Sequence, residues 1–346
     1  MAVNLTVFPY WEHVIKASGI AVLSSLGLVT YIVVLWVIIR NRSHFNNCFY
    51  PYLICLGCFD CLMLSIWLFY SVPTSLLQEY PLGERADSLL GAVSNFTYFG
   101  GLSTVFSISV NRYCGVCRNR SYDSVFTQRN VCINIGLILL IAIVTGTVNA
   151  HACCHVRYYY HLSVWSYEIG LWGIESFIWW EHAVMVLTGS SILICYGAIA
   201  LEMRRTNRFL SRSQLVSQSV LRRRQLTEAR LAGTFFGYGV YVLIESPLFT
   251  ILPSVTEDRW LLYSGTALSY VILCAINPFL YLITNSKLRR KLLGTETPTL
   301  MSNRRKSTAN TFLCRESSLQ KNQRSASDPL MWILNKETKD TGKASL

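Results

Sequence analysis

Three ionisable side chains lie within or beside apolar stretches long enough to cross a bilayer. Asp60 and Glu245 are inside such stretches, and Arg112 is the first charge after a long, nearly uncharged run. A charge in hydrocarbon costs at least roughly 2.5–3.5 kcal/mol, so a charged residue there faces a protein interior and marks a functional site. A charge at the end of a spanning helix, followed by the basic segment 118–129, marks a cytoplasmic boundary. These residues suggest a polar site inside a membrane protein.

Motifs for hydrolytic or metal chemistry do not occur in the sequence. There is no His-Glu-x-x-His motif, no Gly-x-Ser-x-Gly nucleophile elbow and no pair of intramembrane catalytic aspartates. His151, Cys153, Cys154 and His155 cluster, but their spacing matches no standard zinc finger. We therefore expect no enzyme, no metal and no cofactor.

The composition is that of a polytopic membrane protein. Of 346 residues, 52% are hydrophobic and 14% are charged, against roughly a quarter charged in an average soluble domain. The mean hydropathy is +0.35. The net charge of +12 could indicate a nucleic-acid partner. The basic residues cluster beside the apolar runs instead, so we expect no nucleic-acid binding.

Seven apolar segments have about the length of roughly 20 residues that a bilayer core requires. They cover residues 14–39, 49–70, 88–109, 131–150, 179–201, 229–252 and 260–283. The sequence thus predicts an all-α membrane protein, a bundle of seven transmembrane helices over residues 14–293. Residues 1–13 would precede the bundle, and a tail of residues 294–346 would follow it.

The loop charges orient this bundle. Alternate loops are overwhelmingly basic, from Arg40 and Arg42 to the segment 287–291, whereas the loops between them are mixed or acidic. Because basic loops stay in the cytoplasm, the N-terminus is expected outside and the C-terminus inside, in the plasma membrane. Asn4, in Asn-Leu-Thr, then becomes a glycosylation acceptor, whereas the sequon at Asn119 would lie inside and remain bare.

The segment after the seventh span differs from the tail beyond it. Leucines at positions 288, 292 and 293 alternate with cations, which predicts a short amphipathic helix on the inner membrane surface. From residue 294 the chain is rich in Ser, Thr, Asn and Lys and poor in aromatics, which predicts disorder. Hydroxyls behind basic residues at 304–308 and 324–327 could be phosphorylated; an inert solvated tail is the alternative.

Several motifs occur in the order in which rhodopsin-like (class A) G-protein-coupled receptors carry them. Asn-Arg-Tyr at 111–113 resembles the family's Asp-Arg-Tyr signature, and Asn-Pro-x-x-Tyr at 277–281 resembles its seventh-helix motif. The residues that carry the resemblance are Asp60, Asn111, Arg112, Tyr113, Tyr196, Pro247, Asn277, Pro278 and Tyr281. The resemblance covers residues 14–293. It implies a receptor that couples an extracellular small molecule, lipid or peptide to a heterotrimeric G protein, with arrestin and receptor kinases acting on the tail.

The resemblance gives the polar residues roles that their physics supports. Asp60 should pair with Asn277 on the seventh helix. In the family such an Asp also holds a sodium ion, but Gly101 supplies no ligand where a hydroxyl often helps. Pro247 and Pro278 should kink or weaken the sixth and seventh helices, because proline removes a backbone hydrogen bond. That would let the sixth helix swing and Tyr281 reorient.

The resemblance implies that Arg112 turns toward the G protein and Tyr196 on activation. Asn111 replaces the usual Asp; it can hydrogen-bond Arg112 but cannot form the ion pair, so the resting lock should be weak. Thr227 offers a hydroxyl where many relatives have a carboxylate. We therefore expect elevated ligand-free signalling.

The end of the third helix and the loop after it resemble melatonin receptors and related invertebrate orphan receptors more closely. The shared residues are Asn111 to Cys114, Cys117, Tyr122, Asp123 and Asn130. In that register Asn149 matches a ligand-contacting Asn, and His182 lies about half a turn from a ligand-facing His. Glu245 replaces the aromatic switch, and Pro278 stands where those receptors have Ala, so melatonin itself is not the expected ligand.

The candidates for a ligand pocket are Ser94, Asn95, Asn149, His182 and Glu245. Ser94 stands where aminergic receptors have an amine-binding Asp, which disfavours a biogenic amine, although Glu245 could serve as counter-ion. Val271 stands at the retinal-lysine position of opsins and excludes a Schiff base there. Glu245 is either a ligand contact or a protonated partner of another polar side chain, such as Asn95 or Tyr241.

The outer cysteines depart from the family. Most relatives link the third helix to the second outer loop by a disulfide, but the third-helix position here is Asp87. Cys153 and Cys154 remain; an adjacent oxidised pair is strained, and free thiols or a link to another chain are alternatives. Without the usual tether, the aromatic loop at 158–172 must order itself by packing.

Two competing functions follow from the same residues. A transporter or channel predicts internal repeats and pore charges on several helices, and only Asp60 and Glu245 qualify. A receptor-like scaffold without G-protein output is the other alternative, given Asn111 and Glu245. The main prediction is a G-protein-coupled receptor whose ligand is unassigned.

Overall fold

The computed structural model describes residues 9–294 with gaps at 44, 46, 152–153, 169–173, 214–232, 234–235, 246–247, 250–251, 253–254 and 257. The chain divides into two units, Met1–Leu292 and Leu293–Leu346. The predicted tail, together with Asn4, Cys153, Thr227 and Pro247, lies outside the described residues. The description below concerns the first unit.

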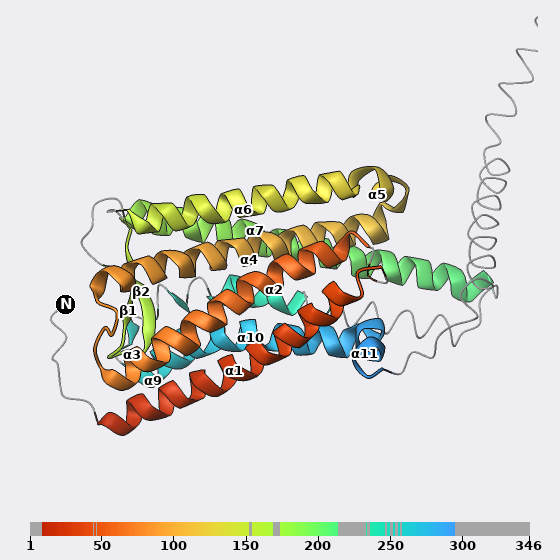
Figure 1. Cartoon of the computed structure of the whole chain (residues 1–346). Helices are drawn as coiled ribbons and strands as arrows, with labels where there is room; N and C mark the ends of the chain where they lie inside the picture. The colour runs from red at the N-terminus through yellow and green to blue at the C-terminus, as the bar shows by residue number, and fades with distance from the viewer. Residues whose placement is uncertain are drawn as a thin grey trace, which may run out of the picture. The chain divides into compact units, whose positions relative to one another are not determined.

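Long helices running side by side build this unit (Figure 1). They are α1 (Tyr10–Arg40), α2 (Phe49–Ile66) continued by η1 (Trp67–Ser71) and α3 (Val72–Leu77), α4 (Glu84–Cys117), α5 (Asn119–Val125), α6 (Gln128–Ala150), α7 (Ile174–Ser213), α9 (Arg259–Leu262) continued by η2 (Tyr263–Leu268) and α10 (Ser269–Thr284), and α11 (Ser286–Leu292). A further apolar helix, Phe236–Glu245, represents the predicted sixth span.

Among the described residues, five helical segments are long and apolar enough to cross a membrane: Tyr10–Arg40, Phe49–Leu77, Gln128–Ala150, Glu175–Thr206 and Arg259–Thr284. Their outward faces are apolar, as Val29 on α1 and Ile194 on α7 illustrate, with 61% and 71% of their surface exposed. A soluble protein would place polar side chains there, so these faces fit a lipid environment.

α4 is the central helix, and its composition differs from that of the five. It contacts α2, α6 and α7, and it buries polar residues such as Ser94, Asn95 and Asn111. Because neighbouring helices cover it on several sides, its polar residues face protein rather than lipid. This arrangement makes α4 the scaffold on which the polar sites are built.

A two-stranded hairpin follows α6. β1 (Val156–Tyr159) pairs antiparallel with β2 (Val164–Tyr167), with Val156 opposite Tyr167. The sequence predicted that this loop orders by packing but did not predict its strands. The packing is aromatic: Tyr158 is fully buried, and its ring lies 6.0 Å from that of Trp67 and 5.3 Å from that of Trp165.

Asp87 connects the hairpin to the helices at the position where relatives have a cysteine. Its carboxylate accepts a 2.7 Å hydrogen bond from the Tyr70 hydroxyl and 3.3 Å hydrogen bonds from the Tyr158 backbone N–H. Burial raises the pKa of Asp87, an effect that the hydrogen bonds from Tyr70 and Tyr158 and the charge of Arg157 offset in part. Arg157 also forms ion pairs with Glu84 at 3.6 Å and Glu168 at 3.1 Å.

The short helix predicted after the seventh span is present as α11. Leu288 is completely buried against the helical core, whereas Leu292 and Leu293 are exposed. Arg289 donates from Nη1 to the backbone carbonyls of Leu282, at 3.1 Å, and Ile283, at 2.9 Å. These bonds fix the turn from α10 into α11.

Candidate functional site

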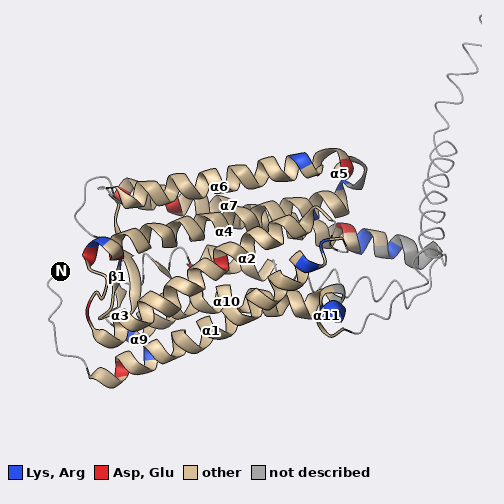
Figure 2. Cartoon of the chain, in the orientation of Figure 1, with Lys and Arg blue, Asp and Glu red and all other residues tan. Residues whose placement is uncertain are grey.

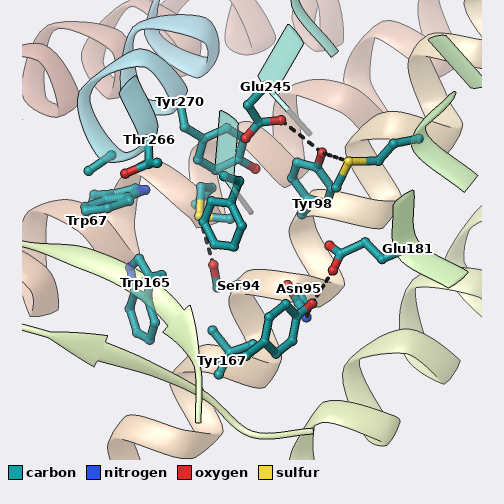
Figure 3. A pocket seen from close by; sticks show the side chains of 15 residues that line it. Trp67, Ser94, Asn95, Tyr98, Trp165, Tyr167, Glu181, Glu245, Thr266 and Tyr270 are labelled. Carbon is teal, nitrogen blue, oxygen red and sulfur yellow. Dashed lines mark hydrogen bonds between the residues drawn. The ribbon is translucent and has the colours of Figure 1, made fainter. Parts of the chain in front are cut away.

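A pocket opens among α2, η1, α4, the hairpin, α7, the helix Phe236–Glu245 and η2 (Figure 3). Its cavity volume is about 70 Å³, so the pocket suits a small ligand. The residues that line it include Met63, Trp67, Ser94, Asn95, Tyr98, Trp165, Tyr167, Glu181, Met185, Glu245, Phe249, Thr266 and Tyr270.

Glu245 lies in this pocket, but its partner is not one of those expected from the sequence. The Tyr98 hydroxyl donates to Glu245 Oε2 at 3.0 Å and lies 3.2 Å from Met185 Sδ. Asn95 donates from Nδ2 to the Tyr167 hydroxyl at 3.3 Å, and Tyr241 donates to Ser269 Oγ at 3.2 Å. Glu245 thus has a polar partner, but it is Tyr98, one turn further along α4 than Asn95, and not Asn95 or Tyr241, the two examples suggested by the sequence.

Glu181 is a second buried carboxylate in the pocket, and sequence reasoning missed it. It is 6% exposed and accepts a short hydrogen bond from the Tyr167 hydroxyl. Asn95, Tyr167 and Glu181 thereby form a hydrogen-bonded chain from α4 across β2 to α7, drawn as dashed lines in Figure 3. The available signal was the one used for Asp60: a carboxylate in a spanning segment needs a protein partner.

The structure brings together three of the five predicted pocket residues. Ser94, Asn95 and Glu245 line the pocket, and Ser94 Oγ lies 3.5 Å from Met63 Sδ. Asn149 and His182 are not among its lining residues. Asn149 is buried on α6 and donates from Nδ2 to the Thr145 carbonyl at 2.9 Å, and His182 Nδ1 lies 2.6 Å from the Ile178 carbonyl. Both side chains bond to the preceding turn of their own helix.

A polar cluster in the middle of the bundle joins three helices around Asp60. Asn277 on α10 donates from Nδ2 to Asp60 Oδ2 at 2.9 Å, the contact expected from the sequence. The hydroxyl of Tyr31 on α1 makes a short hydrogen bond to the same oxygen. Tyr31 was not predicted. Its hydroxyl is the hydrogen-bond donor that α1 contributes to the Asp60 carboxylate.

At the far end of α4, Arg112 contacts an aromatic ring. Its guanidinium carbon lies 4.0 Å from the centroid of the Phe49 ring. Asn111 donates to the Tyr122 hydroxyl at 3.3 Å, so the expected hydrogen bond from Asn111 to Arg112 is not the one formed. Tyr122 in turn lies 3.4 Å from Asn47 Oδ1, which links α4, α5 and the turn before α2.

The remaining described motif residues lie on α4, α7 and α10. Tyr113 is half-buried, Tyr196 and Tyr281 are buried, and Pro278 lies inside α10. Cys154, one of the two outer cysteines, is buried immediately before β1.

The model of the family "Serpentine type 7TM GPCR chemoreceptor Srx" matches residues 21–285 of the chain. The chain belongs to this family. The Srx assignment confirms a rhodopsin-like G-protein-coupled receptor and sets the transporter or channel alternative aside. The family is one of receptors rather than enzymes.

Comparisons with individual proteins agree with this assignment. The Srx chain is 23% identical to melatonin receptor type 1A of Gallus gallus over 142 residues, which are 41% of this chain and 40% of that receptor. It is 24% identical to melatonin receptor type 1B of Homo sapiens over 140 residues, 39% and 37% of the two chains. The matched stretch thus spans two fifths or less of these relatives. The predicted similarity to melatonin receptors is confirmed.

The fold of the Srx chain is that of a solved receptor structure. The crystal structure of squid rhodopsin superposes with a TM-score of 0.67 at 17% sequence identity, over 84% of this chain and 87% of that one. Together with the family match, this similarity supports the predicted bundle of seven transmembrane helices. Within the described residues, α4 covers the third predicted span, and Phe236–Glu245 covers part of the sixth.

Proposed function

We propose that this Srx receptor lies in the plasma membrane, binds an extracellular ligand in the pocket of Figure 3 and activates a heterotrimeric G protein at its cytoplasmic end. One observation carries the proposal. α4 bears pocket residues Ser94, Asn95 and Tyr98 near one end and Arg112 at the other, roughly 20 Å further along the same helix. A movement of α4 at the pocket is therefore transmitted directly to Arg112.

The helix Phe236–Glu245 is the second connection. Its last residue, Glu245, accepts a hydrogen bond from Tyr98 of α4. Pro247 follows two residues later in the sequence. A ligand that competes for Glu245 would release this contact and shift the population of sixth-helix positions, which is how a binding event becomes a conformational signal.

The charges favour one orientation. In Figure 2, many Lys and Arg residues, coloured blue, lie at the end of the bundle that carries α5 and α11. By the positive-inside rule this end faces the cytoplasm and the pocket faces outward. The G protein would then approach Arg112, and arrestin and receptor kinases would act on the tail from the same side.

The proposal is tested by a second-messenger assay in transfected cells, against a panel that includes indoleamines, lipids and peptides. Arg112→Ala should abolish ligand-free and ligand-induced signalling at equal surface expression. Arg85→Ala is the matched control, because Arg85 is exposed at the opposite end of α4. If Arg112→Ala and the wild type both signal to the same extent, Arg112 has no coupling role. If neither protein signals, the result favours a scaffold without G-protein coupling.

A further inference from the structure

The pocket contains two acidic side chains and no basic one. Glu181 and Glu245 are 6% and 7% exposed, and both line the pocket. None of the described residues that line the pocket is Lys, Arg or His. No positively charged side chain among the described lining residues therefore neutralises the pair.

Each carboxylate has one of its oxygens engaged by a neutral phenol. Tyr98 donates to Oε2 of Glu245, and Tyr167 donates to Oε2 of Glu181. A phenol supplies a hydrogen bond but no charge, so the negative charges of an ionised pair stay uncompensated. Buried charges without an opposite charge are strongly destabilising, which makes a cation the natural complement of this site.

An independent observation concerns two indole nitrogens in the same pocket. Trp67 and Trp165 are 2% and 6% exposed, and neither Nε1–H finds an acceptor among the described residues. Figure 3 shows the Trp67 nitrogen on the edge of the ring that faces the pocket. An unpaired buried donor is unfavourable, and a ligand with an acceptor atom would satisfy it.

The aromatic walls fit the same kind of ligand. The rings of Trp67 and Trp165 are 6.5 Å apart and nearly perpendicular, and those of Tyr98 and Tyr270 are 5.6 Å apart. All four residues line the pocket. Faces of Trp and Tyr rings attract organic cations, with Trp the strongest.

We propose that the pocket binds a small organic cation that also carries a hydrogen-bond acceptor. Its positive charge lies between Glu181 and Glu245, and its acceptor meets the indole N–H of Trp67 or Trp165. This inference rests on the proposed function only in using the same pocket. Ser94 stands where aminergic receptors have an acidic residue. The carboxylates of this pocket come instead from Glu181 on α7 and Glu245 on the helix Phe236–Glu245.

The test measures binding to the purified full-length receptor without G protein. Three probes share a para-hydroxyphenyl group: tyramine carries an ammonium, tyrosol a hydroxyl and para-hydroxyphenylpropionate a carboxylate. At about 10 mM, tyramine should raise the Tm by about 2–4 °C, tyrosol by less and the carboxylate not at all. Equal shifts for the three probes, including no shift for any, would overturn the proposal.

Variants locate the charge preference. Glu181→Gln with Glu245→Gln should abolish the difference between tyramine and tyrosol. Glu175→Gln, a change at an exposed carboxylate in the first turn of α7, should keep it. A preference for tyramine that survives the double substitution would place the cation elsewhere and refute the site.

The acceptor is tested separately. Phenethylamine lacks the phenol oxygen and should stabilise the wild type less than tyramine does, and Trp67→Phe with Trp165→Phe should reduce that difference. An unchanged difference would refute the role of the indoles. Because these readouts need no signalling, a receptor that binds cations but activates no G protein would retain this inference and lose the proposed function. A receptor that signals but prefers tyrosol to tyramine would retain the proposed function and lose this inference.

Discussion

Arg112 contacts an aromatic ring in this structure. The Phe49 ring centroid lies 4.0 Å from its guanidinium carbon, and Asn111 is engaged by Tyr122. A cation–π contact contributes about 0.5–1 kcal/mol at exposed sites and about 2 kcal/mol when desolvated. Charge-assisted hydrogen bonds are generally stronger. The contact of Arg112 with Phe49 can therefore be altered without changing any charge.

Phe49→Leu should raise ligand-free signalling about two- to fivefold, because it removes the ring but keeps a similar apolar volume. The measurement is second-messenger output without ligand, corrected for surface expression. Phe49→Trp provides the control, since it preserves an aromatic face and should keep the basal level at or below that of the wild type. A rise in both variants would point to a packing effect rather than to release of Arg112.

Asp87 offers a pH-dependent test of the contact that replaces a disulfide. Its pKa is raised in the folded protein from the ordinary value of 3.8, mainly by burial. The folded state thus binds this proton more tightly than the unfolded chain, and its contribution to stability is lost as the pH rises through the folded pKa. The Tm of Asp87→Asn minus the Tm of the wild type should therefore increase as the pH rises above 3.8.

The measurement is the Tm of both proteins over a pH series in the same detergent. Asp87→Ala is the companion variant. It leaves the Tyr70 hydroxyl and the Tyr158 N–H without their acceptor, and should cost about 1–3 kcal/mol at every pH. If the Tm difference between wild type and Asp87→Asn is independent of pH, Asp87 does not titrate in the way its surroundings imply.

The hairpin depends on a close approach to α4 that only glycine allows. A β-carbon at Gly91 would lie 1.9 Å from the backbone oxygen of Val156. That contact holds β1 beside the first turns of α4, where Tyr158 meets Asp87. The covalent tether of relatives is thus replaced by close backbone packing, a carboxylate and buried aromatic rings.

Gly91→Ala should displace the hairpin and reduce stability by at least the 1–3 kcal/mol typical of overpacking, a Tm loss of several degrees. It should also weaken ligand binding, because Val156, Trp165 and Tyr167 line the pocket. Gly197→Ala on α7 is the matched control, since no atom lies within 4 Å of the added β-carbon. A Tm for Gly91→Ala equal to that of the control would show that β1 is not seated on α4.

The helices were predictable from the sequence because each span carries its own apolar signal. The contact of Asp60 with Asn277 was predictable because a buried carboxylate needs a donor and few polar residues were available. Tyr98 and Tyr31 were not, since they pair with partners 147 and 29 positions away and tyrosines are common in this chain. Glu181 was missed because the polar segment 179–182 suggests a helix boundary as readily as a site.

The hairpin was missed for a different reason. Its strands are four residues each, which is too short for an alternation to stand out in the sequence, and burial alternates along β1 but not along β2. Ser163, at φ 58°, supplies the left-handed residue just before β2. Such a conformation is uncommon for residues other than glycine, and serine does not indicate it in sequence.

The distribution of charge along the chain predicts its orientation in the membrane, and this prediction is testable without any ligand. Lys and Arg residues gather at the end of the bundle that carries α5 and α11, and moving them across the bilayer would be strongly unfavourable. An epitope tag before Met1 should therefore be labelled by antibody on intact cells, and a tag after Leu346 only after permeabilisation. Sugar, where present, should be lost with Asn4→Gln and kept with Asn119→Gln. Labelling of the C-terminal tag on intact cells, or sugar lost with Asn119→Gln, would place Arg112 outside the cell and exclude its contact with a G protein.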